Sequence, residues 1–363
     1  MDVLTVGRVI VDLYANELHR PLEDVESFSK YLGGSAANIA VGLARLGQRC
    51  GLISRVGDDG HGRFLRRYLE ENGVDTRLVG TDPRYRTGLA FAAIFPPQDS
   101  RVLFYRDPCA DTEVHWNDLD PAMIYGARMV IVTGTALAKS PLREAVLHLL
   151  RGRRRRGLLN VMDIDYRPVL WRDPVETVLY YDWAVRLCDV LIGNEAEIAF
   201  AAGAVKRCGE PCDPAANAPG RPPAEKSAPG RDELEAMARA LLRAGVSQVV
   251  VKLGAQGSMA VSEGGTDVAP GFPVQVVNTL GAGDGFAAGF CSGVLWGWPA
   301  ADCLTFGNAV GAIVVSRHGC APAIPTLPEL KAFLADRGRP EMAERLPNGE
   351  RGDATEATEG GRP

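Results

Sequence analysis

Residues 276–286 read VVNTLGAGDGF and combine three structural signals in a short stretch. The β-branched residues at 276–277 favour the end of a strand, the Gly-Ala-Gly at 281–283 favours a turn, and the small residues at 287–289 favour a helix. Free N–H groups at a helix start attract an anion, and glycines let a phosphate approach the backbone closely. We therefore predict an anion site formed by Gly281, Ala282 and Gly283.

Asp284 follows this turn directly, so its carboxylate would lie where the anion binds. A carboxylate there is unfavourable unless a metal ion or an attacking hydroxyl lies between the two charges. A general base that takes the proton from such a hydroxyl meets this requirement. The alternative is a tight turn in which Asp284 is an ordinary helix-start carboxylate.

Residues 32–40, LGGSAANIA, form a second glycine-containing helix start. Gly33 and Gly34 allow close contact with the backbone, and the Asn38 amide offers both a donor and an acceptor to a polyol. The alternative is a Gly-Gly turn with Ser35 as the N-cap. Other nucleotide signatures are missing: the chain has no Gly-Lys dipeptide for a Walker A loop, and Phe286 breaks a GxGxxG pattern.

Short apolar runs alternate with longer amphipathic stretches along the chain. This alternation predicts βαβ units, a mainly parallel sheet covered on both faces, and a ligand site beyond the carboxyl ends of the strands. We predict strands at 3–6, 51–56, 129–133, 158–164, 190–192 and 249–252. We predict helices at 36–46, 62–72, 142–151, 232–244 and 285–295.

Three stretches depart from the alternation. Residues 87–106 favour a hairpin, which together with residues 12–28 would form a small β flap over the sheet. Residues 204–231 are rich in Pro, Ala and Gly, and residues 338–363 are polar with few large apolar side chains. We predict that both of these stretches are mobile or disordered.

Composition narrows the class of protein. The 363 residues carry a formal net charge of −5, which gives no reason to expect a nucleic-acid partner, and we interpret the basic run at 151–156 as a solvated helix end. The eight cysteines form no CxxC pair, and the histidines show no zinc spacing. No apolar run approaches the roughly 18 residues of a membrane span, and the N-terminus lacks a signal-peptide pattern. We therefore expect a cytoplasmic enzyme with no membrane or nucleic-acid partner.

Three motifs in order, GGSAANIAVGLARLG at 33–47, VGDDGHG at 56–62 and NTLGAGD at 278–284, resemble the paired signatures of the PfkB carbohydrate kinases. The resemblance covers roughly residues 1–335, apart from a mobile insertion at 204–231, and leaves 336–363 as a disordered tail. It implies a ribokinase-like three-layer α/β/α sandwich with a mainly parallel central sheet. It also implies a small β lid from about 12–30 and 87–107, which often pairs into a homodimer.

The resemblance assigns roles to individual positions. It makes Asp284 the base and Gly281, Ala282 and Gly283 the anion hole, with ATP and Mg²⁺ as the expected cofactors. Residues 194–197 resemble the family's NxxE motif, which implies that Asn194 and Glu197 organise magnesium, the latter through water. A carboxylate and an amide after a strand suit a hard cation that keeps its waters, and the alternative is a helix start capped by Asn194.

The nucleotide side is implied by two further resemblances. Residues 252–257, KLGAQG, resemble the KxGxxG stretch near the ATP phosphates and ribose, which assigns Lys252, Gly254 and Gly257. Asn308 resembles a residue that borders the adenine pocket. Asn278 stands where the family commonly has Asp, and this departure puts activation by a monovalent cation in doubt.

The sugar side resembles that of the family's sugar-acid kinases. Residues 163–171, DIDYRPVLW, are similar to their DxNxRxxLW stretch, with Asp165 in place of Asn, and Tyr105 and Arg106 resemble their lid segment. Arg106 and Arg167 could clamp a carboxylate, and the alternative is that Arg167 pairs structurally with Asp163. The resemblance assigns the sugar hydroxyls to Asp12, Gly33, Gly34 and Asn38.

A longer resemblance runs through GRVIVDLY at 7–14, residues 21–42 and VTGTALAKSP at 132–141. It points to the members of the family that phosphorylate the 6-hydroxyl of a 5-dehydro-2-deoxy sugar acid in inositol catabolism. A 2-keto-3-deoxy sugar acid or another sugar is the alternative substrate. A non-catalytic sugar-binding member of the fold is a second alternative, whose mark would be loss of the base.

Overall fold

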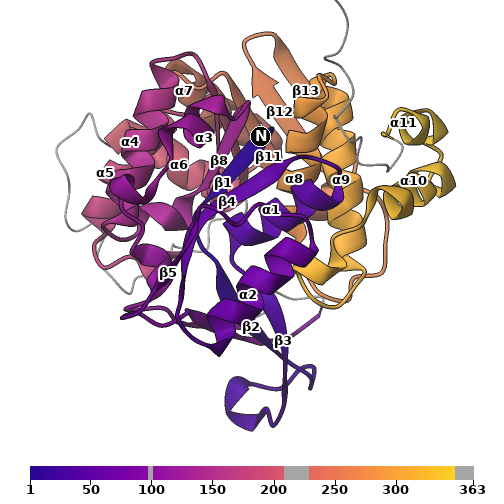
Figure 1. Cartoon of the computed structure of the whole chain (residues 1–363). Coiled ribbons are helices and arrows are strands. Elements are labelled where there is room, and N and C mark those ends of the chain that lie inside the picture. The colour runs from indigo at the N-terminus through magenta and orange to yellow at the C-terminus, as the bar shows by residue number, and fades with distance from the viewer. Residues whose placement is uncertain (97–100, 208–228, 348–363) are drawn as a thin grey trace, which may run out of the picture.

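The computed structural model describes residues 1–96, 101–207 and 229–347. Their main sheet has nine strands and crosses the middle of the molecule (Figure 1). In sheet order these strands are β13 (Gly265–Ala269), β12 (Ser258–Ser262), β11 (Gln248–Lys252), β10 (Val190–Asn194), β9 (Leu159–Asp163), β8 (Met129–Thr133), β1 (Val3–Val6), β4 (Cys50–Gly57) and β5 (Val79–Asp82). All neighbouring pairs from β11 to β5 are parallel, and only β12 and β13 join antiparallel. The expected mainly parallel sheet is confirmed.

Alternating side chains of the central strands feed two separate cores. In β1, Val3 packs into one core, whereas Leu4 and Val6 pack into the other. Such two-sided burial requires near-continuous apolar strands, which is what β1 and β8 have. Helices cover both cores, so the architecture is the predicted three-layer α/β/α sandwich.

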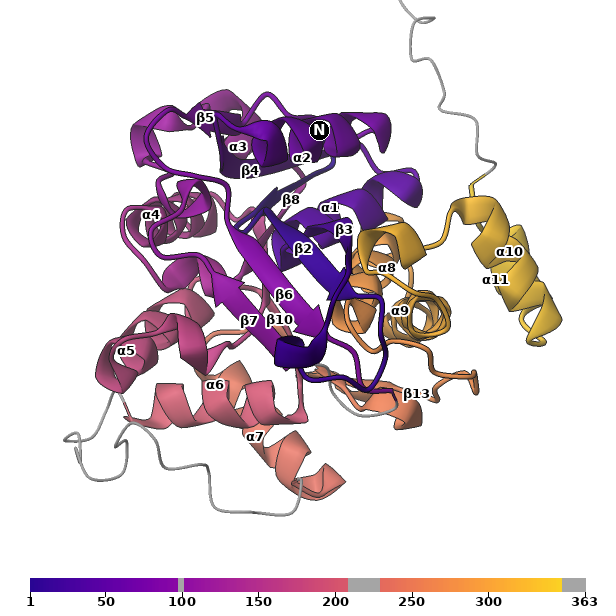
Figure 2. The ribbon, with the colours of Figure 1, turned by 90° about the horizontal axis from the view of Figure 1, so that it is seen from below.

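The two helical layers lie on opposite faces of the sheet (Figures 1 and 2). One layer contains α1 (Ser35–Arg45), α2 (Gly60–Glu71), α8 (Ala282–Leu295), α9 (Ala300–Val315), α10 (Leu327–Asp336) and α11 (Pro340–Glu344). The other contains α3 (Pro121–Gly126), α4 (Leu142–Arg154), α5 (Pro174–Val185), α6 (Glu195–Arg207) and α7 (Arg231–Arg243). The ends of the helices predicted from the sequence agree with α1, α2, α4, α7 and α8 to within three residues.

A second sheet of four strands lies at one end of the strands of the main sheet (Figure 2). Its order is β3 (Phe28–Gly33), β2 (Ile10–Ala15), β6 (Leu89–Ala93) and β7 (Arg101–Tyr105). β6 and β7 pair antiparallel, as the predicted hairpin requires, and β2 pairs with both β3 and β6. The small β flap expected from the sequence is therefore present, with β7 at its edge.

Two predicted boundaries need correction. Residues 336–347 are not a disordered tail, because α11 lies there and Met342 and Leu346 are buried against the core. The insertion predicted from residue 204 begins later, because α6 continues to Arg207. The rest of both predictions, at 208–228 and 348–363, lies outside the described residues. Within the described residues, no helix is both long and apolar enough to cross a membrane.

Candidate active site

The start of α8 is built around Gly281, which is its N-cap with a left-handed φ of 83°. A Cβ at this position would overlap the sulfur of Cys320, so the turn requires glycine both for its backbone and for space. Ala282 is the first helical residue, and Gly283 places its backbone beside the Lys252 ammonium. The turn therefore combines the free N–H groups of a helix start with a cation, as an anion site needs.

Asp284 lies in the first turn of α8 and is held by two side chains from α1. Ser35 Oγ donates to Asp284 Oδ1 at 2.7 Å, and Asn38 Nδ2 donates to Oδ2 at 2.7 Å. Burial, followed by the negative charge of Asp165, raises the pKa of Asp284, whereas these two hydrogen bonds lower it. The result is a carboxylate fixed in orientation and more basic than a surface aspartate, which suits proton abstraction.

The two helix starts predicted separately therefore meet at one carboxylate. Ser35 is not the N-cap of α1, because Gly34 takes that position with φ 96° and Ser35 is turned toward Asp284. The Asn38 amide donates to the same group, and among the described residues its Oδ1 has no hydrogen-bond partner. The role of Ser35 was missed because nothing in its local sequence distinguishes a cap from a contact with a residue 249 positions away.

Lys252 connects the anion turn to the carboxyl ends of β9 and β10. Its Nζ lies 3.2 Å from Asp163 Oδ2 and 3.9 Å from Glu197 Oε2. Burial would lower the pKa of this ammonium, but Asp163 and Glu197 together hold it above its ordinary value. Lys252 is therefore a charged group next to Gly283, and it partly neutralises two buried acids.

Asn194 and Glu197 form a reciprocal cap at the start of α6. The Asn194 N–H donates to Glu197 Oε2 at 2.8 Å, and the Glu197 N–H donates to Asn194 Oδ1 at 2.9 Å. This is the helix-start alternative, and it is fully formed. The described residues contain no group of three His, Cys, Asp or Glu side chains that could hold a metal. Buried Glu197 beside Asp163 fits instead an ion that keeps its waters and is held mainly by phosphates.

The predicted sugar residues at the second sheet lie close together. Asp12 on β2 lies against the backbone of Gly33, where a Cβ would overlap its carboxylate. Tyr14 Oη is 3.4 Å from Asp12 Oδ2. Burial raises the pKa of Asp12 to about 7, although Arg8 opposes the rise. A group of this kind can exchange hydrogen bonds with a polyol in either protonation state.

The three residues predicted at the acid end of the sugar are arranged differently from a simple clamp. Arg106 is buried and paired with Asp111, with its Nε and Nη2 at 2.8 and 2.7 Å from Oδ2. Arg167 is half-exposed and pairs with Asp165 at 3.1 Å rather than with Asp163. Tyr105 is 60% exposed and contacts the Phe91 ring. Arg106 is thus held in an ion pair with Asp111, although its Nη2 has no hydrogen-bond partner among the described residues, and Arg167 is the more accessible cation.

The residues predicted for the nucleotide lie beyond the end of β11. Gly254 and Gly257 both have positive φ, and a Cβ on Gly257 would overlap the carbonyl of Ala269. Asn308 on α9 donates to the carbonyls of Ala269 and Pro270, each at 3.1 Å. Asn308 therefore holds the end of β13 and the residue after it in place, and its amide group already donates to these two backbone carbonyls.

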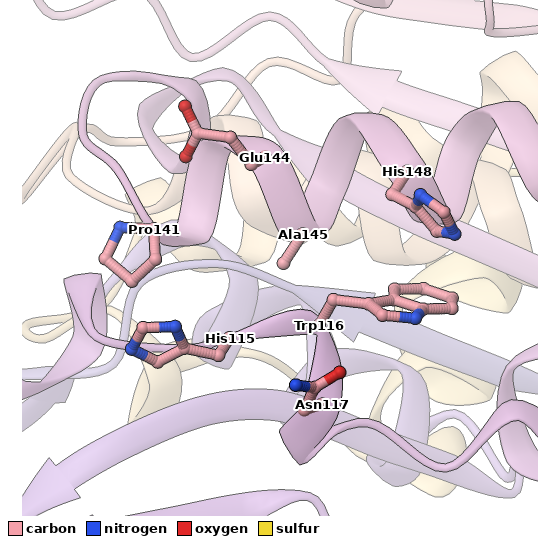
Figure 3. A pocket seen from close by; sticks show the side chains of 7 residues that line it. All are labelled: His115, Trp116, Asn117, Pro141, Glu144, Ala145 and His148. Carbon is pink, nitrogen blue, oxygen red and sulfur yellow. The ribbon is translucent and has the colours of Figure 1, made fainter.

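A hollow of about 330 Å³ lies elsewhere, between Trp116 and α4 (Figure 3). Trp116 and His148 face each other there with ring centroids 4.1 Å apart, and Glu144 and His115 flank them. None of the predicted site residues lines it. This hollow is therefore separate from the candidate site, which is the region around Asp284, Lys252 and Asp12.

Comparison with known proteins agrees with this geometry. The model of the pfkB family carbohydrate kinases matches residues 1–327. A 5-dehydro-2-deoxygluconokinase of Geobacillus kaustophilus is 42% identical over 336 residues, which are 92% of this chain and 93% of the relative.

Solved structures are also similar to the chain. A PfkB protein from Polaromonas sp. JS666 has a TM-score of 0.73 and 30% identity, covering 91% of this chain and 99% of that one. A sugar kinase from Pyrococcus horikoshii in complex with ATP has a TM-score of 0.75 and 25% identity, covering 95% and 99%. The family model spans most of the chain, and the kinase relative is 42% identical over nearly its whole length. The chain therefore belongs to the pfkB family of carbohydrate kinases.

Proposed function

We propose that this chain uses ATP to phosphorylate the 6-hydroxyl of 5-dehydro-2-deoxy-D-gluconate, with Asp284 as the general base. The observation that carries the proposal is the buried Asp284 carboxylate, fixed by Ser35 and Asn38 at the start of α8. The name of the Geobacillus kaustophilus relative supports this sugar acid. Because Asp284 keeps its whole glycine frame, a non-catalytic sugar-binding role is disfavoured.

In the proposed reaction Asp284 takes the proton from the sugar hydroxyl as its oxygen attacks the γ-phosphorus. The new O–P bond forms while the bond to the bridging oxygen of ADP breaks. The N–H groups of Gly281–Gly283 at the start of α8, with the Lys252 ammonium beside Gly283, would stabilise the charge on the transferred group. Hydrogen bonds from Ser35 and Asn38 keep the base aimed at the hydroxyl.

ATP supplies the phosphoryl group, and Mg²⁺ bound to it would neutralise phosphate charge. The residues proposed to contact the nucleotide are Lys252, Gly254, Gly257 and Asn194, with Asn308 shaping the adenine side. Glu197, which is buried near Lys252, would reach the metal through water. The Leu280 N–H donates to Asn278 Oδ1 at 3.0 Å. This side-chain oxygen is therefore engaged by the backbone of its own turn rather than free to bind a monovalent cation.

We also propose a cytoplasmic homodimer formed through the second sheet. β7 is an edge strand, with Leu103 and Tyr105 48% and 60% exposed. An unpaired edge strand with exposed apolar side chains is a natural surface for pairing with a second copy.

A purified-enzyme assay with ATP and Mg²⁺ tests the substrate. The panel is 5-dehydro-2-deoxygluconate, 2-keto-3-deoxygluconate, fructose and ribose, compared by kcat/KM. We expect the first sugar acid to be turned over fastest and both neutral sugars slowest. Preference for 2-keto-3-deoxygluconate would favour the alternative substrate, and equal values for acidic and neutral sugars would refute the proposal.

A further inference from the structure

Arg8 is a buried cation that the roles assigned so far leave unused. It follows β1, at the carboxyl edge of the sheet where ligands of open α/β folds bind. The residue is 6% exposed, and its Nε and Nη1 have no hydrogen-bond partner in the part of the chain that the structure describes. Buried guanidinium groups are normally hydrogen-bonded, so two nitrogens of this group are open to an acceptor, and an anion is the acceptor that matches their charge.

The nearest acids do not meet this demand. Arg8 Nη2 is 3.8 Å from Asp165 Oδ2, which is beyond hydrogen-bond range. Asp165 is already bound on both sides, by Arg167 Nε at 3.1 Å and by Thr135 Oγ1 at 2.9 Å. The positive charge of Arg8 lowers the pKa of Asp12, but no hydrogen bond joins the two side chains among the described contacts.

Arg8 also connects the two sheets. Its guanidinium carbon lies 5.0 Å from the centre of the Phe104 ring on β7. Its backbone carbonyl and Cγ lie against Gly34, at the start of α1. The charge is therefore placed between the strand edge and the second sheet, close to Asp12 and Gly34, which are proposed to hold the sugar.

We propose that Arg8 binds the carboxylate of the sugar acid and sets the preference for acidic over neutral sugars. This inference rests on the proposed function. Arg106, predicted for this role from the sequence, forms a close ion pair with Asp111 at 2.7 Å, and among the described residues only its Nη2 lacks a hydrogen-bond partner. The ion pair of Arg8 with Asp165 is 3.8 Å long, and both its Nε and its Nη1 lack a hydrogen-bond partner there. A planar guanidinium held by aromatic contact matches carboxylate geometry, and its partial desolvation strengthens the pair.

The test compares Arg8→Met with wild type on 5-dehydro-2-deoxygluconate and on fructose, a neutral sugar of the same chain length. We expect the ratio of the two kcat/KM values to fall by about 10- to 150-fold, mainly through KM for the acid, because a charge-assisted contact is lost. Arg8→Lys keeps the charge but not the planar donors, and it should restore part of the ratio. Arg55→Met removes a partly buried arginine that pairs with Asp82 away from the site, and it should leave the ratio unchanged.

The outcomes separate the two proposals. If wild type neither binds the sugar acid in calorimetry nor phosphorylates it, the proposed function is wrong and the role of Arg8 falls with it. If wild type uses the acid and Arg8→Met keeps the same ratio, only the role of Arg8 is wrong. An equal loss for acid and fructose would show a structural role and also overturn it. Should Arg8→Met fail to fold, Arg8→Lys decides: an unchanged acid-to-fructose ratio and an unchanged calorimetric Kd for the acid would refute the role.

Discussion

The phosphate end and the sugar end of the candidate site are built in opposite ways. At the phosphate end, Gly281 to Asp284 are consecutive residues of one helix start, and residues from other segments only pack against it or hold its carboxylate. At the sugar end, Arg8, Asp12, Asp165 and Arg167 come from distant segments and depend on one another for position. The backbone of the phosphate end is therefore set by one local motif, whereas the arrangement of the sugar end depends on long-range pairing.

Replacing the base should have the largest effect. Asp284→Asn keeps the shape of the side chain but removes the proton acceptor, so we expect kcat to fall by about 10²–10⁴. KM for ATP and for the sugar should change much less, because binding rests mainly on other groups. Steady-state and single-turnover rates measure the effect with chemistry isolated.

Asp12→Asn is a matched control, because Asp12 is another aspartate at the same site, with a raised pKa. It should act mainly on KM for the sugar. If Asp284→Asn keeps more than about a tenth of wild-type kcat while chemistry limits the rate, the general-base role is wrong. Asp284 would then contribute only by positioning groups in the site and through its negative charge.

The same contrast explains what the sequence could predict. The strands at 3–6 and 129–133 agree with β1 and β8 residue for residue, because a strand buried on both faces needs an unbroken apolar run. The turn at Gly281 was predictable because its left-handed backbone favours glycine, whereas the overlap with Cys320 that also requires glycine could not be seen in the sequence. β12 and β13 were missed, since Ser, Thr, Asp and Gly interrupt their apolar pattern.

The role of a charged residue was hard to predict from the sequence where the residue is buried. The basic run at 151–156 was interpreted as a solvated helix end, yet Arg153 is fully buried. It donates to Asn160 and to the carbonyls of Ile124, Ala127 and Leu159. Arg106, predicted to bind substrate, is also buried and forms an ion pair with Asp111, and its role toward the substrate stays a prediction. The partner of a buried arginine is set by tertiary packing, and no local pattern reports it.

The second-largest effect should come from Lys252. Lys252→Met leaves Asp163 and Glu197 without their shared cation and removes the charge beside Gly283. We expect kcat/KM for ATP to fall by about 10- to 150-fold, the loss expected for a hydrogen bond to a charged group. Lys252→Arg keeps the charge and should lose less. Initial rates at varied ATP measure both variants, and an unchanged value for Lys252→Met would remove Lys252 from the phosphate end.

The smallest effect should come from Ser35, which acts on the base across the two helix starts. Ser35→Ala removes one of the two hydrogen bonds to Asp284 and leaves the Asn38 bond in place, so kcat should fall only about fivefold. That hydrogen bond lowers the pKa of Asp284, so its loss should raise the pKa further. The base is active when ionised, and the rising limb of the kcat profile should therefore move to higher pH. Ser292→Ala is the control, because Ser292 is also a buried serine, lies on α8, and donates to the Ala288 carbonyl of its own helix rather than to Asp284. A fall in kcat with no movement of the limb would mean that Ser35 supports the fold of the site without tuning the base. The pKa of Asp284 would then be set by groups other than Ser35.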